Sequence, residues 1–479
     1  MSNSSLFWFR QDLRLADNPG LIKAAQHDNL IAVYIEDPNI GSASQWWLHH
    51  SLTKLNESLG NKLNIYQGDP KQIIFKLIND YNLDAVYWNR CYEPWRIQMD
   101  SKLKADLKER KVPCETFNAS LLWEPMQILK NDKTYYKVFT PFYQNGCLKV
   151  DRPRDPLRKP RAISFIKDKN SLVIADLRLL PKIEWYKSFE EHWDTGEKAA
   201  HDKLKHFLSY EIKRYKEGRD FPATNSVSRL SPHLHFGEIS PHQVWAAVQL
   251  KRLQSPIESN NLDHFIRELC WREFSYYLLY HFPELPYKNF QNKFDRFPWQ
   301  KKSSHLKAWQ KGLTGYPIID AGMRELWHTG YMHNRVRMIA GSFLVKNLLI
   351  DWREGEAWFR DCLVDADLAN NSASWQWVAG SGADAAPYFR IFNPITQGEK
   401  FDPEGAYTKR FVPELKQLPN KYLFKPWEAP VSVLKDAGVK LGKNYPLPIV
   451  YLQLSRQRAL QSFASLGDKC TGFEALKKF

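Results

Sequence analysis

The amino-acid sequence predicts two structural units: an α/β domain built on a doubly wound, five-stranded parallel sheet, followed by a large all-α domain. Three observations predict this organisation. Five short apolar runs lie within the first 120 residues, amphipathic helical stretches separate them, and no convincing strand follows residue 197. Strict alternation of strand and helix is typical of a parallel sheet with helices on both faces. At 479 residues, the chain is long enough for more than one hydrophobic core.

The expected strands are short runs rich in β-branched and aromatic residues. They cover residues 5–10, 30–36, 62–68, 84–90 and 114–119. The two clearest intervening helices cover residues 42–59 and 94–111, and they open with Ser42 and Pro94, residue types that favour a helix start. Neither GxGxxG after the first strand nor a GxxxxGK loop occurs, which excludes those two modes of phosphate binding.

The pattern changes after the fifth strand. We expect the α/β domain to cover residues 1–130, an interdomain linker 131–196 and the helical domain 197–479. The linker contains the basic, proline-broken stretch DRPRDPLRKPR at 151–161, which is typical of a connecting loop. Beyond the linker, apolar residues recur at the 3.6-residue spacing of helices, for example at 201–218 and 262–282.

Composition indicates the kind of partner and the compartment. The chain has 68 Lys and Arg against 53 Asp and Glu, a net charge of +15, so a polyanion is a natural partner, with a plain basic protein as the alternative. No secretory signal and no run of 18 apolar residues occurs, so we expect a cytoplasmic protein without a membrane segment. No metal site or disulfide framework is expected, because the six cysteines lie far apart without zinc-like spacing. They are Cys91, Cys114, Cys147, Cys270, Cys362 and Cys470.

The stretch SRLSPHLHFGEISPHQVW, residues 228–245, contains two predicted helix starts. Ser231 and Ser240 each precede a proline, the pattern of an N-cap followed by Pro at the first helical position. The unpaired N–H groups of a helix start, together with Ser228, Arg229 and Ser231, could bind a diphosphate. Simple capping is the alternative.

Polar residues also share faces of three expected helices. Glu268, Trp271 and Arg272 fall at i, i+3 and i+4, so Glu268 either pairs with Arg272 or faces a polar ligand. Further along, HNRVRM places Asn334, Arg337 and Met338 on one face, with Arg335 turned away, and LVDADLANNSASWQW adds Asp365, Asp367, Asn371, Trp375 and Trp377. Amides and carboxylates among aromatics indicate either a planar heteroaromatic ligand or a polar network within a helical core.

Several blocks together resemble the photolyase and cryptochrome family, most closely the bacterial class I photolyases that act on cyclobutane pyrimidine dimers. In chain order they are QDLRLADN, GRDFPA, SRLSPHL, ELCWREF, TGYPIIDAGMREL, MHNRVRMIAGSFLVK, LLIDWREGE, DLANNSASWQW and YFRIFNP. The resemblance spans nearly the whole chain. It implies a helical domain that encloses folded FAD, and an α/β domain that often carries an antenna chromophore. We also expect a monomer.

The resemblance also assigns the flavin contacts. The corresponding residues are Tyr215, Ser228, Arg229, Leu230 and Ser231 around the diphosphate, Arg337 and Asp365 as an ion pair over the isoalloxazine ring, and Asp367 and Asn371 at its edge. Asn371 lies where plant cryptochromes have Asp. Val227 stands where Thr is common in the family, so the resemblance does not supply a hydroxyl contact at this position.

A lesion pocket follows from the same resemblance. Its residues are Glu268, Trp271, Asn334, Met338 and Trp377. Trp271 and Trp377 would wall a flipped-out dimer, and Glu268, if protonated, would donate a hydrogen bond to a pyrimidine carbonyl as that group gains electron density. The expected activity is that of a carbon–carbon lyase: light-dependent repair of cyclobutane dimers by electron transfer from excited, reduced FAD. The alternatives are a cryptochrome-type photoreceptor and a (6-4) photolyase, which places His in the segment where this chain has Asn334 and Met338.

The remaining assignments concern electron transfer, DNA and the antenna. Trp375, Trp352 and Trp299 resemble the tryptophan chain that photoreduces oxidised flavin, and Arg219, Arg272, Arg335 and Arg390 lie where the family contacts DNA phosphates. For the antenna, methenyltetrahydrofolate is the first expectation, with a deazaflavin or FMN next. Trp46, Trp47, Glu93 and Trp95 would contact it, unless the two adjacent tryptophans only pack the helix.

Overall fold

The computed structural model describes residues 3–161, 163–385 and 389–467. Its first domain contains a five-stranded sheet with strand order β3-β2-β1-β4-β5, in which every neighbouring pair is parallel. The strands are β1 Ser4–Phe9, β2 Asn29–Ile35, β3 Asn64–Tyr66, β4 Ala85–Asn89 and β5 Cys114–Phe117. The predicted doubly wound parallel sheet is therefore confirmed, with strand limits within two residues of those expected.

Helices cover both faces of this sheet. They are α1 Pro19–Ala24, α2 Ser42–Ser58, α3 Pro70–Tyr81 and α4 Pro94–Glu109. Because side chains alternate along a strand, Phe7 and Phe9 of β1 enter one core with α1 and α2, whereas Leu6 and Trp8 enter the other with α3 and α4. The helix starts predicted at Ser42 and Pro94 are confirmed.

The segment after β5 is irregular, as expected. Its short elements are η1 Pro125–Gln127, α5 Phe139–Pro141, η2 Phe142–Cys147, η3 Ile174–Leu177 and η4 Trp185–Glu191. It returns to the sheet, where Phe165 forms a bridge with Leu30 and Leu172 with Ile65. Part of the expected linker thus packs against the first domain.

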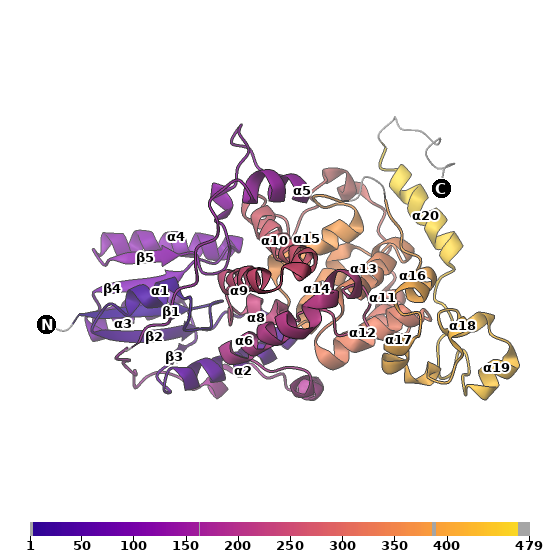
Figure 1. The fold of residues 1–479 in the computed structure, drawn as a ribbon, viewed down its shortest axis with the longest axis horizontal. Coiled ribbons are helices and arrows are strands. Elements are labelled where there is room, and N and C mark those ends of the chain that lie inside the picture. Colours follow the sequence, from indigo (N-terminus) through magenta and orange to yellow (C-terminus); the bar gives the residue numbers. More distant parts are fainter. Residues whose placement is uncertain (1–2, 162, 386–388, 468–479) are drawn as a thin grey trace.

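The second domain is helical from Glu197 onward. Its α-helices are α6 Glu197–His206, α7 Tyr215–Gly218, α8 Ser231–His235, α9 Pro241–Gln254, α10 Ser259–His281, α11 Ser303–Gln310, α12 Pro317–Thr329, α13 Asn334–Ser342, α14 Trp352–Cys362, α15 Leu368–Ala379, α16 Pro394–Phe401, α17 Ala406–Phe411, α18 Asn420–Leu423, α19 Val431–Asp436 and α20 Leu452–Ala464. Single turns of 3-10 or π type are η5 Phe207–Glu211, η6 Ile212–Arg214, η7 Pro256–Glu258, η8 Asn292–Arg296, η9 Phe343–Asn347, η10 Pro413–Leu415 and η11 Pro426–Glu428. Figure 1 shows α10, α13, α14 and α15 in the middle of the molecule, between the sheet domain and α18–α20.

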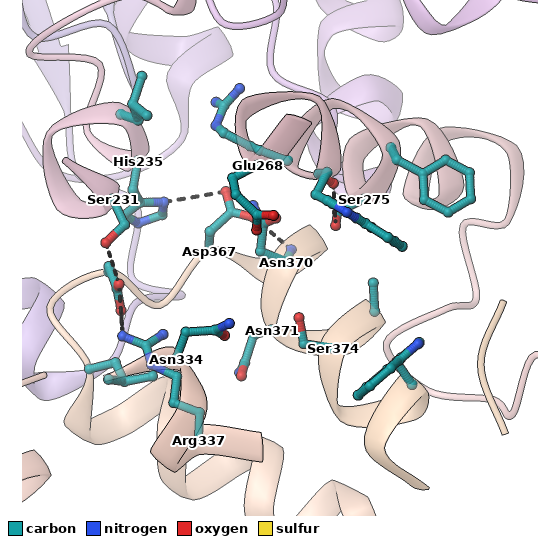
Figure 2. Close-up of a pocket in the computed structure, with 18 of the residues that line it drawn as sticks. Ser231, His235, Glu268, Ser275, Asn334, Arg337, Asp367, Asn370, Asn371 and Ser374 are labelled. Atoms are coloured by element: carbon teal, nitrogen blue, oxygen red, sulfur yellow. Dashed lines mark hydrogen bonds and ion pairs between the residues drawn. The ribbon is translucent and has the colours of Figure 1, made fainter. Parts of the chain in front are cut away.

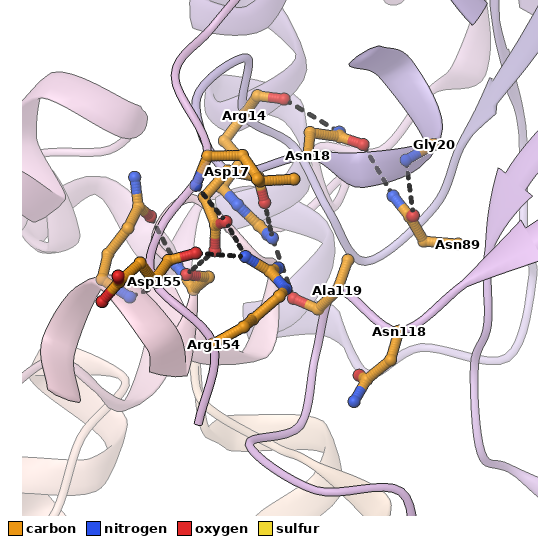
Figure 3. A network of polar contacts seen from close by, with 12 residues as sticks. Arg14, Asp17, Asn18, Gly20, Asn89, Asn118, Ala119, Arg154 and Asp155 are labelled. Atoms are coloured by element: carbon orange, nitrogen blue, oxygen red, sulfur yellow. Dashed lines mark hydrogen bonds and ion pairs between the residues drawn. The ribbon is translucent and has the colours of Figure 1, made fainter. Parts of the chain in front are cut away.

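A buried polar joint connects the sheet domain, the linker and α9 (Figure 3). The guanidinium of Arg14, which is fully buried, donates to the carbonyls of Asp17 at 2.7 Å, Ala119 at 2.8 Å and Gly237 at 2.9 Å. The Asp17 carboxylate accepts hydrogen bonds from Arg154 of the linker and from the Ser240 hydroxyl. Ser240 also caps α9, as its sequence predicts. The joint therefore fixes the two domains to each other.

Two further findings concern membrane-spanning helices and the cysteines. Among residues 3–161, 163–385 and 389–467, no helix combines the length and the apolar character needed to cross a membrane. Five cysteines are free thiols, and Cys470 lies outside the described residues.

Candidate active site

A cavity of about 560 Å³ lies among α8, α10, α13, α14 and α15, a volume within the usual range of small-molecule sites. It brings together most of the residues singled out from the sequence. They are Tyr215, Arg219, Ser228, Leu230, Ser231, Glu268, Trp271, Arg272, Asn334, Arg337, Met338, Asp365, Asp367, Asn371, Trp375 and Trp377. In Figure 2, Glu268 of α10 and Arg337 of α13 lie on opposite sides of this cavity.

One wall of the cavity carries a buried cation. Arg337 Nη2 lies 2.9 Å from Asp365 Oδ2, and its Nε donates to the Met332 carbonyl at 2.7 Å. Burial alone would lower the pKa of the Arg337 guanidinium, but the Asp365 carboxylate more than offsets it and the pKa is raised. Arg337 and Asp365 thus form an ion pair, which keeps Arg337 charged, and its predicted place over an isoalloxazine ring stays a prediction.

The prediction that Ser231 is an N-cap is wrong. Leu230 holds the N-cap position of α8, and Ser231 is the first helical residue. Its hydroxyl instead donates to Asp365 Oδ2 at 2.6 Å. The carboxylate therefore receives hydrogen bonds from both Arg337 and Ser231, which fixes its orientation at the cavity wall.

A second carboxylate, Asp367, caps α15 at the edge of the cavity. It accepts hydrogen bonds from the Asn370 N–H at 2.8 Å and from the Tyr276 hydroxyl, and its Oδ2 lies 3.5 Å from His235 Nδ1. Although burial raises the pKa of Asp367, the nearby His235 and Arg272 side chains and the hydrogen bond from Tyr276 outweigh burial, and the pKa is lowered. His235 and Tyr276 were not singled out from the sequence, although His235 lies four residues after Ser231 in the same helix.

The amide of Asn371 is held by a residue that the sequence analysis missed. Its Nδ2 donates to Glu356 Oε1 at 3.0 Å and to the Glu356 carbonyl at 3.1 Å. Burial raises the pKa of Glu356. Glu356 could have been singled out because it is the last residue of the LLIDWREGE block. Nothing in that block, however, indicates that Glu356 contacts Asn371.

Glu268 does not pair with Arg272. Its Oε1 lies 2.5 Å from Nη1 of Arg219, whereas Arg272 donates to the Ser120 carbonyl at 2.8 Å and to Glu273 Oε1 at 3.2 Å. The Arg272 side chain is only 11% exposed, which disfavours its predicted contact with a DNA phosphate, and that contact stays a prediction. The buried Glu273 carboxylate requires a cationic partner, and Arg272 supplies it.

The two tryptophans expected to wall the lesion are held by residues outside their helices. The Trp271 ring stacks on Phe139 of the linker, with centroids 3.8 Å apart and an interplanar angle of 9°. Trp377 Nε1 donates to the Asp384 carbonyl at 3.0 Å, and the Asp384 carboxylate accepts from the Phe139 N–H at 3.2 Å. Asp384, with a left-handed φ of 53°, thus connects both walls.

Arg229 does not line the cavity with its side chain, contrary to expectation. Its guanidinium lies between the rings of Trp193, at 4.2 Å from the centroid, and Tyr331, at 4.7 Å. This double cation–π contact favours a position behind the cavity wall. Any contribution of Arg229 to a diphosphate site would have to come from its backbone.

The three tryptophans of the expected electron relay lie at different depths. Trp375 lines the cavity, Trp352 is fully buried, and Trp299 is half-buried. The indole Nε1 of Trp352 donates to Asn289 Oδ1 at 2.9 Å. This order agrees with a path from the cavity to the surface, and the relay itself remains a prediction.

A second pocket places two of the expected DNA-binding arginines together. Arg335 and Arg390 line it with Lys400, Gln397, the aromatic residues Phe221, Phe392 and Phe401, and the acidic residues Glu217 and Asp220. The Arg335 guanidinium lies 4.4 Å from the centroid of the Phe401 ring, and its Nη2 is 2.7 Å from Asp220 Oδ2. Cations interleaved with aromatic rings are typical of nucleic-acid-binding surfaces.

The expected stacking role of Trp46 and Trp47 is wrong. Their side chains are 1% and 0% exposed, because they pack edge-on against Phe189 and Trp193. Trp47 Nε1 also donates to Glu238 Oε1 at 3.1 Å. Both are helix-packing residues, the alternative weighed from the sequence. Of the other two expected contacts, Glu93 is buried and Trp95 is half-buried.

Comparison with known proteins agrees with this geometry. The family model of DNA photolyase matches residues 5–161, and that of the FAD binding domain of DNA photolyase matches residues 265–465. A deoxyribodipyrimidine photo-lyase of Agrobacterium fabrum is 50% identical, covering 96% of this chain and 98% of its own length. The crystal structure of a bacterial class III photolyase from Agrobacterium tumefaciens is 49% identical, with a TM-score of 0.94 over 97% of this chain and 98% of the other. A cryptochrome structure from Synechocystis sp. PCC6803 is 30% identical, with a TM-score of 0.89 over 96% of this chain and 99% of the other. The chain therefore belongs to the DNA photolyase and cryptochrome family.

Proposed function

We propose that this protein is a deoxyribodipyrimidine photo-lyase, which repairs cyclobutane pyrimidine dimers in DNA by a light-dependent reaction of bound FAD. One observation carries the proposal: a single cavity joins a flavin-type polar wall, formed by Arg337, Asp365 and Asn371, to the aromatic residues Trp271 and Trp377. A flavin and a flipped-out dimer would therefore have adjoining places in it. Electron transfer between two ligands requires such proximity.

The residues of the cavity fit FAD. Tyr215, Ser228 and Ser231 line the cavity with hydroxyl groups that could donate to a diphosphate, and Phe265 and Leu269 supply an apolar surface for ring systems. Arg337 supplies the cation that favours negative charge on a reduced flavin. When bound, reduced and excited by light, FAD supplies one electron to the dimer, which returns it after the cyclobutane bonds have broken.

The protein's own residues bind and orient the lesion in this proposal. A dimer is poorly stacked in the duplex, so extruding it takes less free energy than extruding normal bases. Trp271 and Trp377 would stack on the extruded bases and exclude water from them. Glu268 and Asn334 would hydrogen-bond the pyrimidine edges, with Glu268 directed at a carbonyl that gains electron density.

The structural comparison favours class III over the class I assignment expected from the motifs. The solved class III photolyase shares 49% of its residues with this chain and superposes with a TM-score of 0.94. We therefore propose that this protein is a class III enzyme. The motifs could not separate the classes, because the cavity residues on which the class I expectation depended are flavin and lesion contacts rather than class markers.

We also propose an antenna chromophore, with methenyltetrahydrofolate first and a deazaflavin or FMN next, and a cytoplasmic monomer. Since Trp46 and Trp47 are buried, the antenna would lie elsewhere than against their rings. Extraction of the chromophore and light scattering of the purified protein test these points.

The decisive experiment is repair by purified protein. A duplex with one cyclobutane thymine dimer is incubated with reduced protein, in blue light and in the dark, and restored thymines are measured. We expect repair only in light, and none of a (6-4) photoproduct. A flavin-containing protein that restores neither lesion would favour a cryptochrome-type photoreceptor instead.

A further inference from the structure

Two residues adjacent in the sequence, Arg219 of the cavity lining and Asp220 of the second pocket, form ion pairs in different directions. Arg219 Nη1 lies 2.5 Å from Glu268 Oε1 on α10, and Asp220 Oδ2 lies 2.7 Å from Arg335 Nη2 on α13. All four side chains are partly open to solvent, with exposed fractions between 18% and 37%. One of the four, Glu268, belongs to the proposed lesion contacts, and Arg219 is its partner in the free protein.

We propose that the Arg219–Glu268 ion pair makes one DNA phosphate contact conditional on the lesion. When a dimer enters the cavity, Glu268 takes up a proton from solvent and donates it in a hydrogen bond to a pyrimidine carbonyl; Arg219 thereby loses its anionic partner and is released to bind a phosphate of the flanking strand. With undamaged DNA the bases stay stacked and Glu268 retains Arg219. The inference rests on the proposed function, because it requires a dimer to face Glu268.

The exchange is chemically reasonable for this pair. Burial lowers the pKa of Arg219, but its hydrogen bond with Glu268 and other nearby groups raise the pKa more, so the guanidinium stays charged. Ion pairs that are partly exposed contribute little net stabilisation, so a competing phosphate can replace the carboxylate. While the pair persists, Glu268 neutralises Arg219 and weakens its attraction for any phosphate, which discriminates against undamaged DNA.

The Asp220–Arg335 ion pair serves as the matched control, because neither of its residues lines the lesion cavity. Arg335 lines the second pocket and not the lesion cavity. A phosphate that reaches Arg335 displaces Asp220 whether or not a lesion is present. Neutralising Asp220 should therefore affect damaged and undamaged DNA equally.

Salt dependence of binding, measured in the dark by fluorescence anisotropy, tests the inference. Each phosphate contact adds about 0.9 to the slope of log affinity against log salt. We expect the wild-type slope for a duplex with one dimer to exceed that for the same undamaged duplex by about one unit. In Arg219→Ala this difference should vanish, with weaker binding of damaged DNA only.

Glu268→Gln gives the opposite sign, which a misfolded protein cannot mimic. Because this variant frees Arg219 without a lesion, its salt slope for undamaged DNA should be about one unit steeper than that of wild type. Between 200 and 50 mM salt, its affinity for undamaged DNA should therefore increase about fourfold more than the wild-type affinity does. Asp220→Asn should strengthen binding of both duplexes by the same factor.

Equal slopes for the two duplexes in a wild-type protein that repairs dimers would overturn the conditional contact alone. So would an unchanged undamaged-DNA slope in Glu268→Gln. A wild-type protein that performs no light-dependent repair would overturn the proposed function, and the conditional contact with it.

Discussion

Replacing Trp352 with Phe should separate the two light reactions expected of this protein. We predict that Trp352→Phe blocks photoreduction of oxidised flavin, because Phe is much harder to oxidise than Trp. Repair of dimers by chemically pre-reduced protein should persist, because Trp352 does not line the cavity. The substitution keeps an aromatic ring at a position that is 0% exposed.

The structure gives the size of the accompanying loss of stability. A near-isosteric swap in a core costs up to about 1.5 kcal/mol. Trp352 Nε1 also donates to Asn289 Oδ1 at 2.9 Å, and Asn289 is 4% exposed. Leaving that buried acceptor without its donor costs a further ~1–3 kcal/mol. We therefore expect the free energy of unfolding to fall by roughly 2–4 kcal/mol.

The assay records flavin absorbance under blue light with an external reductant, beside dimer reversal in an anaerobic sample reduced with dithionite. The control is Asn289→Ala, which removes the same hydrogen bond but keeps the indole. It should lose about 1–3 kcal/mol of stability and still photoreduce its flavin. The two variants therefore separate loss of the relay from loss of packing.

Two results would refute this reasoning. Photoreduction that survives in Trp352→Phe would mean that electrons reach Trp375 by another route. One neighbour is Trp309, whose ring centroid lies 6.1 Å from that of Trp375. Loss of repair from pre-reduced flavin would instead place Trp352 in the catalytic core.

Three further predictions concern the lesion walls, DNA binding and pH. Asp384→Ala should weaken binding of dimer-containing DNA about tenfold, or roughly 1.4 kcal/mol, without loss of flavin. The substitution removes the side-chain acceptor for the Phe139 N–H, so Asp384 no longer connects Phe139 to Trp377. Asp384→Asn, which keeps a side-chain oxygen as acceptor, should bind normally in the same titration. Arg335→Ala should lower the salt slope of binding by about one unit for damaged and undamaged DNA alike, and an unchanged slope would remove Arg335 from the interface. Burial raises the pKa of Glu273 from 4.5 to about 7, so its contribution to stability is present below pH 4.5 and lost as the pH rises through about 7. Across that window the stability of Glu273→Gln relative to wild type should therefore increase by on the order of 2 kcal/mol. The measurement is denaturation of both proteins at pH 5 and 8, and an unchanged difference in unfolding free energy between the two pH values would contradict the prediction.

The sheet domain was predictable because its signals are local. Each strand is a short apolar run between turn residues, and the chain order of strands and helices allows few topologies. The residues that share a face of α10 or of α13 could be predicted equally well, because a 3.6-residue period alone places Asn334, Arg337 and Met338 together. The motifs then predicted what that face would bind.

Pairing across the chain was not predictable in the same way. Spacing allowed Glu268 to reach Arg272, but a loop residue 49 positions earlier, Arg219, is its partner. Arg272 is drawn instead to Glu273 and Ser120, and Ser120 lies 152 residues away in sequence. The helical period indicates which residues share a face of a helix. It does not indicate which distant segment of the chain packs against that face.

The polar joint around Arg14 bears on how the chain is made. Two of its contacts, Arg14 with Gly237 and Asp17 with Ser240, each join residues 223 positions apart. Domains generally fold in order as a chain leaves the ribosome. Here the emerging sheet domain holds a buried guanidinium that lacks one of its three acceptors until residue 237 has been synthesised. The first domain therefore completes its structure only when the second has begun to form, and the sheet domain expressed alone would carry this defect permanently.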